Sequence, residues 1–178
     1  MKRFIIILIL TVLSISALYF YNNPPPRNYE RFANKITANV AKKLKEEHDL
    51  HLVGIGGRMM YSVEMMSMRF DYYHQITLEE ARKLLVIAIK EYLSAINSDE
   101  KIRPYLKEYP FTAKNVEIGI FILQSNGSKV PPDKIYYISN MDDILSYYIA
   151  KQNGFSTRTA ICEESYEEAL QLLGEPLP

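Results

Sequence analysis

The chain has 178 residues, about half of them apolar, which is enough for one hydrophobic core and too few for two. Its 21 Lys and Arg residues balance its 21 Asp and Glu residues, so no overall positive field attracts nucleic acid, and we expect no nucleic-acid partner. The single cysteine, Cys162, excludes an intramolecular disulfide and a thiolate metal cluster.

The N-terminal segment is an apolar run with basic residues only in front of it. Phe4–Tyr21 contains no charged residue. As a helix it would be about 27 Å long, close to the thickness of the hydrocarbon core of a bilayer. Lys2 and Arg3 precede it, which predicts that the N-terminus stays in the cytoplasm. We therefore expect residues 4–21 to contact the membrane as a single-pass anchor in the cytoplasmic (inner) membrane.

The rest of the chain is then exported, into the periplasm in a Gram-negative cell. We divide it into an anchor or signal segment at 1–21, a proline-rich spacer at 22–27 and one domain at 28–178. The alternative is a secretory signal cleaved near Ala17, which would release the same domain as a secreted protein. Both interpretations place the domain outside the cytoplasm.

The first elements of the domain are a helix and two strands. Apolar residues at helical spacing predict a helix from Asn28 to about Glu47. Leu50–Arg58 is typical of a short strand that runs into a glycine turn or bulge where two backbones approach closely, and Met60–Tyr73 of a second strand. The alternation of apolar residues in the second strand changes phase at Met65 and Met66, which predicts a β-bulge there.

A long apolar helix follows and dominates the pattern. Thr77 and Glu80 have the spacing of a capping box, so the helix is expected to begin at this point and to end near Asn97. Most of its middle circumference is apolar, with Leu85 at the centre of the stripe, so it must be covered on more than one side. Pro104 and Pro110 then limit the next segment to a short helical turn and a surface connection.

The remaining pattern predicts further strands and a final helix. Ser165 and Glu168 repeat the capping-box spacing before that helix, and Asn153 with Gly154 is typical of a two-residue hairpin turn. The expected strands are Val116–Leu123, Lys134–Ser139, Ile144–Lys151 and Phe155–Ile161. We predict an α+β fold: an N-terminal transmembrane helix, then a mostly antiparallel sheet of about five or six strands packed against two to three helices.

No motif assigns a catalytic residue or a cofactor. His48, Asp49 and His51 are of types that bind metals, but their spacing is not diagnostic, and we expect no metal site. A charged rim is expected where the second strand meets the long helix, formed by Glu64, Arg69, Asp71, Glu79, Glu80 and Arg82. The candidate interaction residues are Arg69, on the polar face of that strand, and Arg103, Tyr105 and Tyr109 in the connection after the helix.

Two segments in the middle of the chain resemble a known protein family. Leu78–Asn97 and Ile102–Thr112 are similar to an uncharacterised family of exported proteins from intracellular bacteria. That family has no assigned function, so the resemblance implies no activity, substrate or cofactor. We expect a membrane-anchored envelope domain with a non-enzymatic role, binding another envelope protein or a small ligand. The alternatives are an exported hydrolase-type enzyme and a component of an envelope or secretion assembly.

Overall fold

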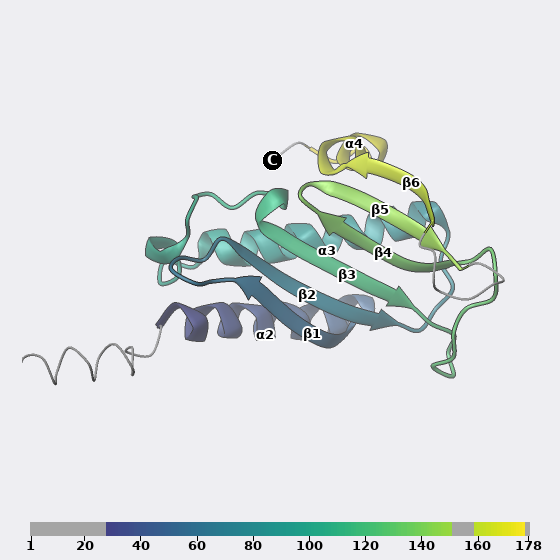
Figure 1. The fold of residues 1–178 in the computed structure, drawn as a ribbon, viewed down its shortest axis with the longest axis horizontal. Helices are drawn as coiled ribbons and strands as arrows, with labels where there is room; N and C mark the ends of the chain where they lie inside the picture. The colour runs from purple at the N-terminus through teal and green to yellow at the C-terminus, as the bar shows by residue number, and fades with distance from the viewer. Residues whose placement is uncertain (1–27, 151–158, 177–178) are drawn as a thin grey trace, which may run out of the picture.

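A computed structural model describes residues 28–150 and 159–176. Within them, six strands form one sheet in the order β1-β2-β3-β4-β5-β6 (Figure 1). Neighbouring strands are antiparallel except β2 and β3, which run parallel. The predicted α+β class and mostly antiparallel sheet are confirmed for this part of the chain.

The bounds of most elements lie close to the predicted ones, but β2 begins at Met65 where Met60 was predicted, and β6 ends at Ser165 where Ile161 was predicted. In chain order they are α2 (Asn28–His48), β1 (His51–Arg58), β2 (Met65–Tyr72), α3 (Leu78–Ser98), the 3₁₀ turns η1 (Arg103–Tyr105) and η2 (Ala113–Asn115), β3 (Val116–Ile122), β4 (Ile135–Met141), β5 (Ile144–Ile149), β6 (Thr159–Ser165) and α4 (Tyr166–Leu172).

Helices α2 and α3 cover one face of the sheet (Figure 1). Leu85, Ile89 and Tyr92 of α3 are completely buried, and the helix contacts α2, α4 and strands β3 to β5. This confirms that the apolar helix is covered on more than one side. The two helices are also joined by a buried hydrogen bond of 2.7 Å between the hydroxyl groups of Thr37 and Tyr92.

Helix α3 is the connection between the two parallel strands. A parallel pair needs a crossover, because the chain must return to the end from which the first strand started. The 21 residues of α3 span about 32 Å, which is enough to run back along the eight-residue strand β2, about 26 Å long. The capping box predicted at its start is confirmed: Thr77 and Glu80 each accept a hydrogen bond from the other's backbone N–H.

The glycines of the predicted turn lie inside β1 instead. Gly56 pairs with Ser67 of β2, and a Cβ atom at Gly56 would lie 2.8 Å from the Ser67 hydroxyl oxygen. The predicted close approach of a neighbouring strand is therefore confirmed at this glycine, whereas a turn at these glycines is wrong. The predicted bulge is also wrong, because Met65 and Met66 pair in regular register with β1, whose own irregularity lies after Leu52.

A buried ion pair ties β6 to α3. The Arg82 guanidinium donates to both carboxylate oxygens of Glu164, at 2.7 and 3.0 Å, and the Tyr147 hydroxyl donates to the same carboxylate at 2.6 Å. The Arg82 side chain is 14% exposed and that of Glu164 is 7% exposed. This network fixes the sheet edge from which α4 begins, next to the candidate site.

Part of the sequence prediction falls outside the described residues. The predicted membrane span Phe4–Tyr21, the spacer 22–27 and the hairpin turn at Asn153 and Gly154 all do so. Among the residues that are described, no helix is long and apolar enough to cross a membrane.

Candidate functional site

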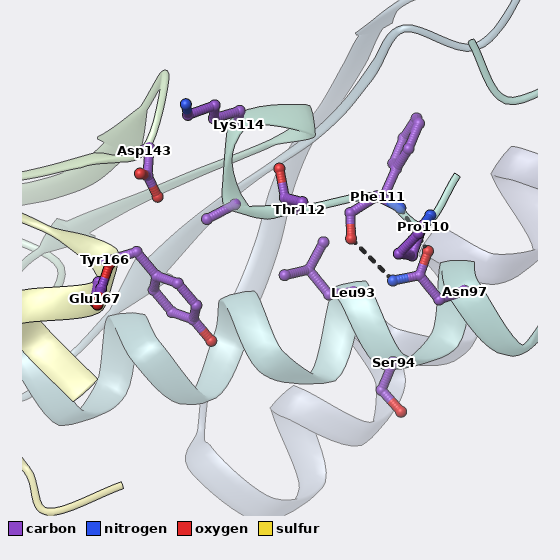
Figure 2. Close-up of a pocket in the computed structure, with 11 residues that line it drawn as sticks. Leu93, Ser94, Asn97, Pro110, Phe111, Thr112, Lys114, Asp143, Tyr166 and Glu167 are labelled. Atoms are coloured by element: carbon purple, nitrogen blue, oxygen red, sulfur yellow. Dashed lines mark hydrogen bonds between the residues drawn. The ribbon is translucent and has the colours of Figure 1, made fainter. Parts of the chain in front are cut away.

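A cavity of about 620 Å³ opens between the end of α3, the connection before β3, the β4–β5 turn and the start of α4 (Figure 2). Apolar groups of Leu93, Pro110, Phe111 and Ala113 form much of its wall. The other lining residues carry polar groups: Ser94, Asn97, Thr112, Lys114, Asp143, Tyr166 and Glu167. An apolar cavity of this size with a few polar groups is typical of a small-molecule site.

Asn97 holds one wall of the cavity in place. Its side-chain amide donates to the Phe111 carbonyl oxygen at 2.9 Å, and its side-chain oxygen accepts from the Phe111 N–H at 2.8 Å (Figure 2). Both backbone polar groups of Phe111 are thereby satisfied, as they would be by a neighbouring strand. The last turn of α3 and the connection after Pro110 therefore form one rigid unit.

Two more asparagines hold the next part of the connection. Asn140 of β4 is buried, accepts from the Ile118 N–H at 2.7 Å and donates to the Val116 and Ala113 carbonyl oxygens. The side-chain oxygen of Asn115 accepts from the Thr112 N–H at 3.0 Å. The loop that lines the cavity is thus fixed to the sheet by side chains whose hydrogen bonds are satisfied.

The turn between β4 and β5 places a carboxylate at the cavity. Asp142 and Asp143 have φ angles of 49° and 76°, and the residues on either side of them pair in the sheet, as in a two-residue hairpin with positive φ at both positions. The Asp143 backbone carbonyl accepts from the Tyr166 N–H at 3.0 Å, which joins this turn to the first residue of α4.

Asp143 is half-buried, and burial raises the pKa of its carboxyl group; the positive charge of Lys114 opposes this rise and the negative charge of Glu167 adds to it. No hydrogen bond or ion pair from a described residue reaches the Asp143 carboxylate.

Tyr166 supplies the polar group on the inner wall. The residue is only 5% exposed, and its ring lies beside α3 with the hydroxyl group directed along the cavity (Figure 2). Burial raises the pKa of Tyr166 to about 12, so the group is a neutral hydroxyl at ordinary pH. It has no hydrogen-bond partner among the described residues, whereas every fully buried side-chain N or O atom there has one. The hydroxyl group is therefore available to a molecule in the cavity.

The four predicted interaction residues do not form one surface. The Arg103 guanidinium carbon lies 4.7 Å from the centre of the Tyr109 ring, and both side chains donate to the Asn97 carbonyl oxygen, at 3.5 and 3.3 Å. These two residues therefore lie beside the cavity, at the end of α3. Tyr105 instead packs against α2, with its ring 5.7 Å from that of Tyr29. Arg69 is exposed on β2, on the sheet face opposite the helices.

The histidine cluster differs from the predicted one. The two carboxylate oxygens of Asp49 lie 2.9 Å from His51 Nε2 and 2.8 Å from His74 Nε2, and these hydrogen bonds, first that to His74, lower the pKa of Asp49. His48 lies beside Glu47 instead, at 4.0 Å. In the described part of the chain, no group of three or more His, Cys, Asp or Glu residues is placed to hold a metal ion.

The predicted charged rim is dispersed over several contacts. Arg82 is paired with Glu164 inside the protein, and Glu64 with Lys107, 3.2 Å away on the surface. Glu80 belongs to the capping box of α3. These residues are explained by their roles in the fold.

Comparison of the chain with protein-family models, curated proteins and solved structures gave no match.

The cavity could not be predicted from the sequence, because the residues that line it come from four separate segments of the chain. Each of them has a local explanation: a helix end, a proline-rich connection, a turn and a capping box. Asp142 and Asp143 at a tight turn were the one available signal, since glycine or asparagine is the more common choice where φ is positive.

Proposed function

We propose that this chain is a non-enzymatic binding domain, held at the outer face of the cytoplasmic membrane by its N-terminal segment, and that the α3–α4 cavity takes a small ligand with an apolar body. One observation carries the proposal: the hydroxyl group of Tyr166, a residue 5% exposed, lies along an apolar cavity of about 620 Å³ and lacks a partner among the described residues. Because every fully buried side-chain N or O atom among the described residues has a partner, this hydroxyl group is open to the cavity, where a ligand can form a hydrogen bond with it.

The membrane location rests on the sequence. The uncharged run Phe4–Tyr21 is long enough to cross a bilayer, and Lys2 and Arg3 favour a cytoplasmic N-terminus. The short proline-rich spacer would then hold the domain close to the membrane surface. A ligand reaching the cavity would come from outside the cytoplasm.

An exported hydrolase is a second candidate, because Asp143 is desolvated beside the cavity. Hydrolysis by a protein nucleophile needs that nucleophile within hydrogen-bonding distance of a base, and a third group to orient the base. Among the described lining residues no hydrogen bond joins two such groups, since the Asp143 carboxylate and the Tyr166 hydroxyl group have no partner there. This favours binding over catalysis.

A part in an envelope or secretion assembly is favoured by a different feature, the outer edge of the sheet. Among the described strands, β1 pairs with β2 only, and its side chains Val53 and Ile55 are 55% and 58% exposed. An exposed apolar edge strand can pair with a strand of another protein. An Ile55→Lys variant would weaken such pairing and leave ligand binding in the cavity unchanged, which separates the two roles.

The test of ligand binding uses three small probes with the same ring and different charge: 2-phenylethylamine, 2-phenylethanol and 3-phenylpropanoate. Each is titrated into the purified full chain and followed by amide NMR. We expect at least one probe to shift the amide signals of Leu93, Phe111 and Tyr166. Leu93→Trp should abolish the shifts by filling the cavity, whereas Leu172→Trp, the same exchange at a helix position that is 65% exposed, should not.

The proposal fails if no probe binds, or if Leu93→Trp, shown to be folded by its melting curve, binds all three probes as the wild type does.

A further inference from the structure

The mouth of the cavity carries three charged side chains without partners. Asp143 and Glu167 are acidic and Lys114 is basic, and no hydrogen bond or ion pair to a described residue involves any of the three side chains. Figure 2 shows Asp143 and Lys114 on the same side of the cavity, above Tyr166. Acidic groups therefore outnumber basic ones where a ligand would enter, which favours a cation over an anion.

Asp143 is the acidic group that lies in the least favourable surroundings for a charge. It is half-buried, it lacks a hydrogen-bond donor from any described residue, and burial raises its pKa. Its backbone has positive φ, where asparagine or glycine serves equally well without a charge. The fold therefore does not require an aspartate here, whereas a cationic ligand would.

The hydroxyl group of Tyr166 is an independent observation in the same cavity. The residue is more than nine-tenths buried, its Oη atom lacks a partner among the described residues, and its ring lies below Asp143 and Lys114 in Figure 2. A neutral hydroxyl can accept a hydrogen bond from an N–H group or donate one to a ligand oxygen. Together with the apolar side chains of Leu93 and Ala113, it lines the cavity that Asp143 also borders.

We propose that the cavity selects ligands that carry an ammonium group on an apolar body, with the ammonium group at the Asp143 carboxylate and the apolar body against Leu93, Ala113 and the Tyr166 ring. This inference rests on the proposed function and specifies its ligand class. Lys114 does not reverse the preference, because its exposed, flexible side chain can turn its charge to solvent, whereas Asp143 is fixed in a tight turn.

The three probes test this selectivity directly. In the wild type, 2-phenylethylamine should bind at least about tenfold more tightly than 2-phenylethanol, since a charge-assisted hydrogen bond is lost in the alcohol, and 3-phenylpropanoate should bind most weakly. Asp143→Asn should remove the advantage of the amine and keep the turn, because asparagine adopts positive φ readily. Asp142→Asn changes the neighbouring carboxylate of the same turn, which does not line the cavity, and should have no effect.

Tyr166→Phe gives a control that does not depend on the turn. The variant keeps the ring that contacts the apolar body, and the lost hydroxyl group makes no hydrogen bond to a described residue, so the melting temperature and the preference for the amine should both stay unchanged.

Equal affinities for the three probes, or a preference for the amine that survives in Asp143→Asn, would overturn the ammonium inference and leave the binding function standing. Failure of all three probes to bind would instead remove the proposed function, and this inference with it.

Discussion

The ion pair between Arg82 and Glu164 offers a sharp test of the fold. Arg82→Met keeps much of the apolar stem and removes the charge, so the Glu164 carboxylate keeps the Tyr147 hydroxyl as a donor but loses both bonds from the guanidinium group. Breaking a buried pair from one side costs roughly 3–5 kcal/mol. Because the Arg82 side chain is still 14% exposed, water can partly solvate the carboxylate, and we expect a loss of about 3 kcal/mol.

The assay is equilibrium unfolding in urea, with Lys43→Met as the matched control. Lys43 Nζ lies 2.8 Å from Glu91 Oε2, but these side chains are 46% and 32% exposed. Water therefore replaces the lost partner, and the loss of unfolding free energy should be far smaller. The double variant Arg82→Met/Glu164→Gln should regain part of the loss, since no unpaired charge is left buried. Equal losses of unfolding free energy for Arg82→Met and Lys43→Met would refute the reasoning, because burial of an ion pair would then not change the cost of breaking it.

Three further predictions follow from other parts of the chain. Leu85→Ala should lower the free energy of unfolding by ~2–5 kcal/mol, whereas Leu172→Ala, at a position 65% exposed, should change it little. Asp143→Asn should raise the melting temperature at neutral pH. Burial raises the pKa of Asp143, so ionisation costs stability above that pKa, and the gain should fade as the pH falls toward 3.8. A reporter enzyme fused after Pro178 should be active only when exported; cytoplasmic activity would contradict the predicted topology.

The capping patterns predicted the starts of two helices correctly, whereas features that depend on contacts between distant residues were not predicted. The capping boxes at Thr77 and Ser165 were found because each depends on residues three positions apart. The glycines of β1 indicated a close approach of two backbones, but the sequence does not show that Ser67 of β2 is the residue that comes close to Gly56. The pairing of β2 with β3 likewise depends on the path of α3 across the sheet, which no short pattern records.

The candidate site could not be predicted from local sequence patterns for the same reason. Arg103 and Tyr109 were singled out as an aromatic surface connection, and they do lie beside the cavity, but their contacts are with the end of α3. The residues that carry the proposal, Asp143 and Tyr166, are brought together by one backbone hydrogen bond between a turn and a helix start. These two side chains were proposed to bind a ligand because they lack hydrogen-bond partners among the described residues. Only the three-dimensional structure shows this.

The rigidity of the cavity wall decides how binding data should be interpreted. Asn97 holds Phe111 from the α3 side, and Asn140 holds the backbone of Ala113 and Val116 from the sheet side, all through hydrogen bonds that exist without a ligand. A preformed site costs little ordering entropy on binding. Affinity differences among probes that share one ring must then arise from the groups they contact. A loss of amine binding in Asp143→Asn would therefore measure the contact with that carboxylate, with little contribution from reorganisation of the loop.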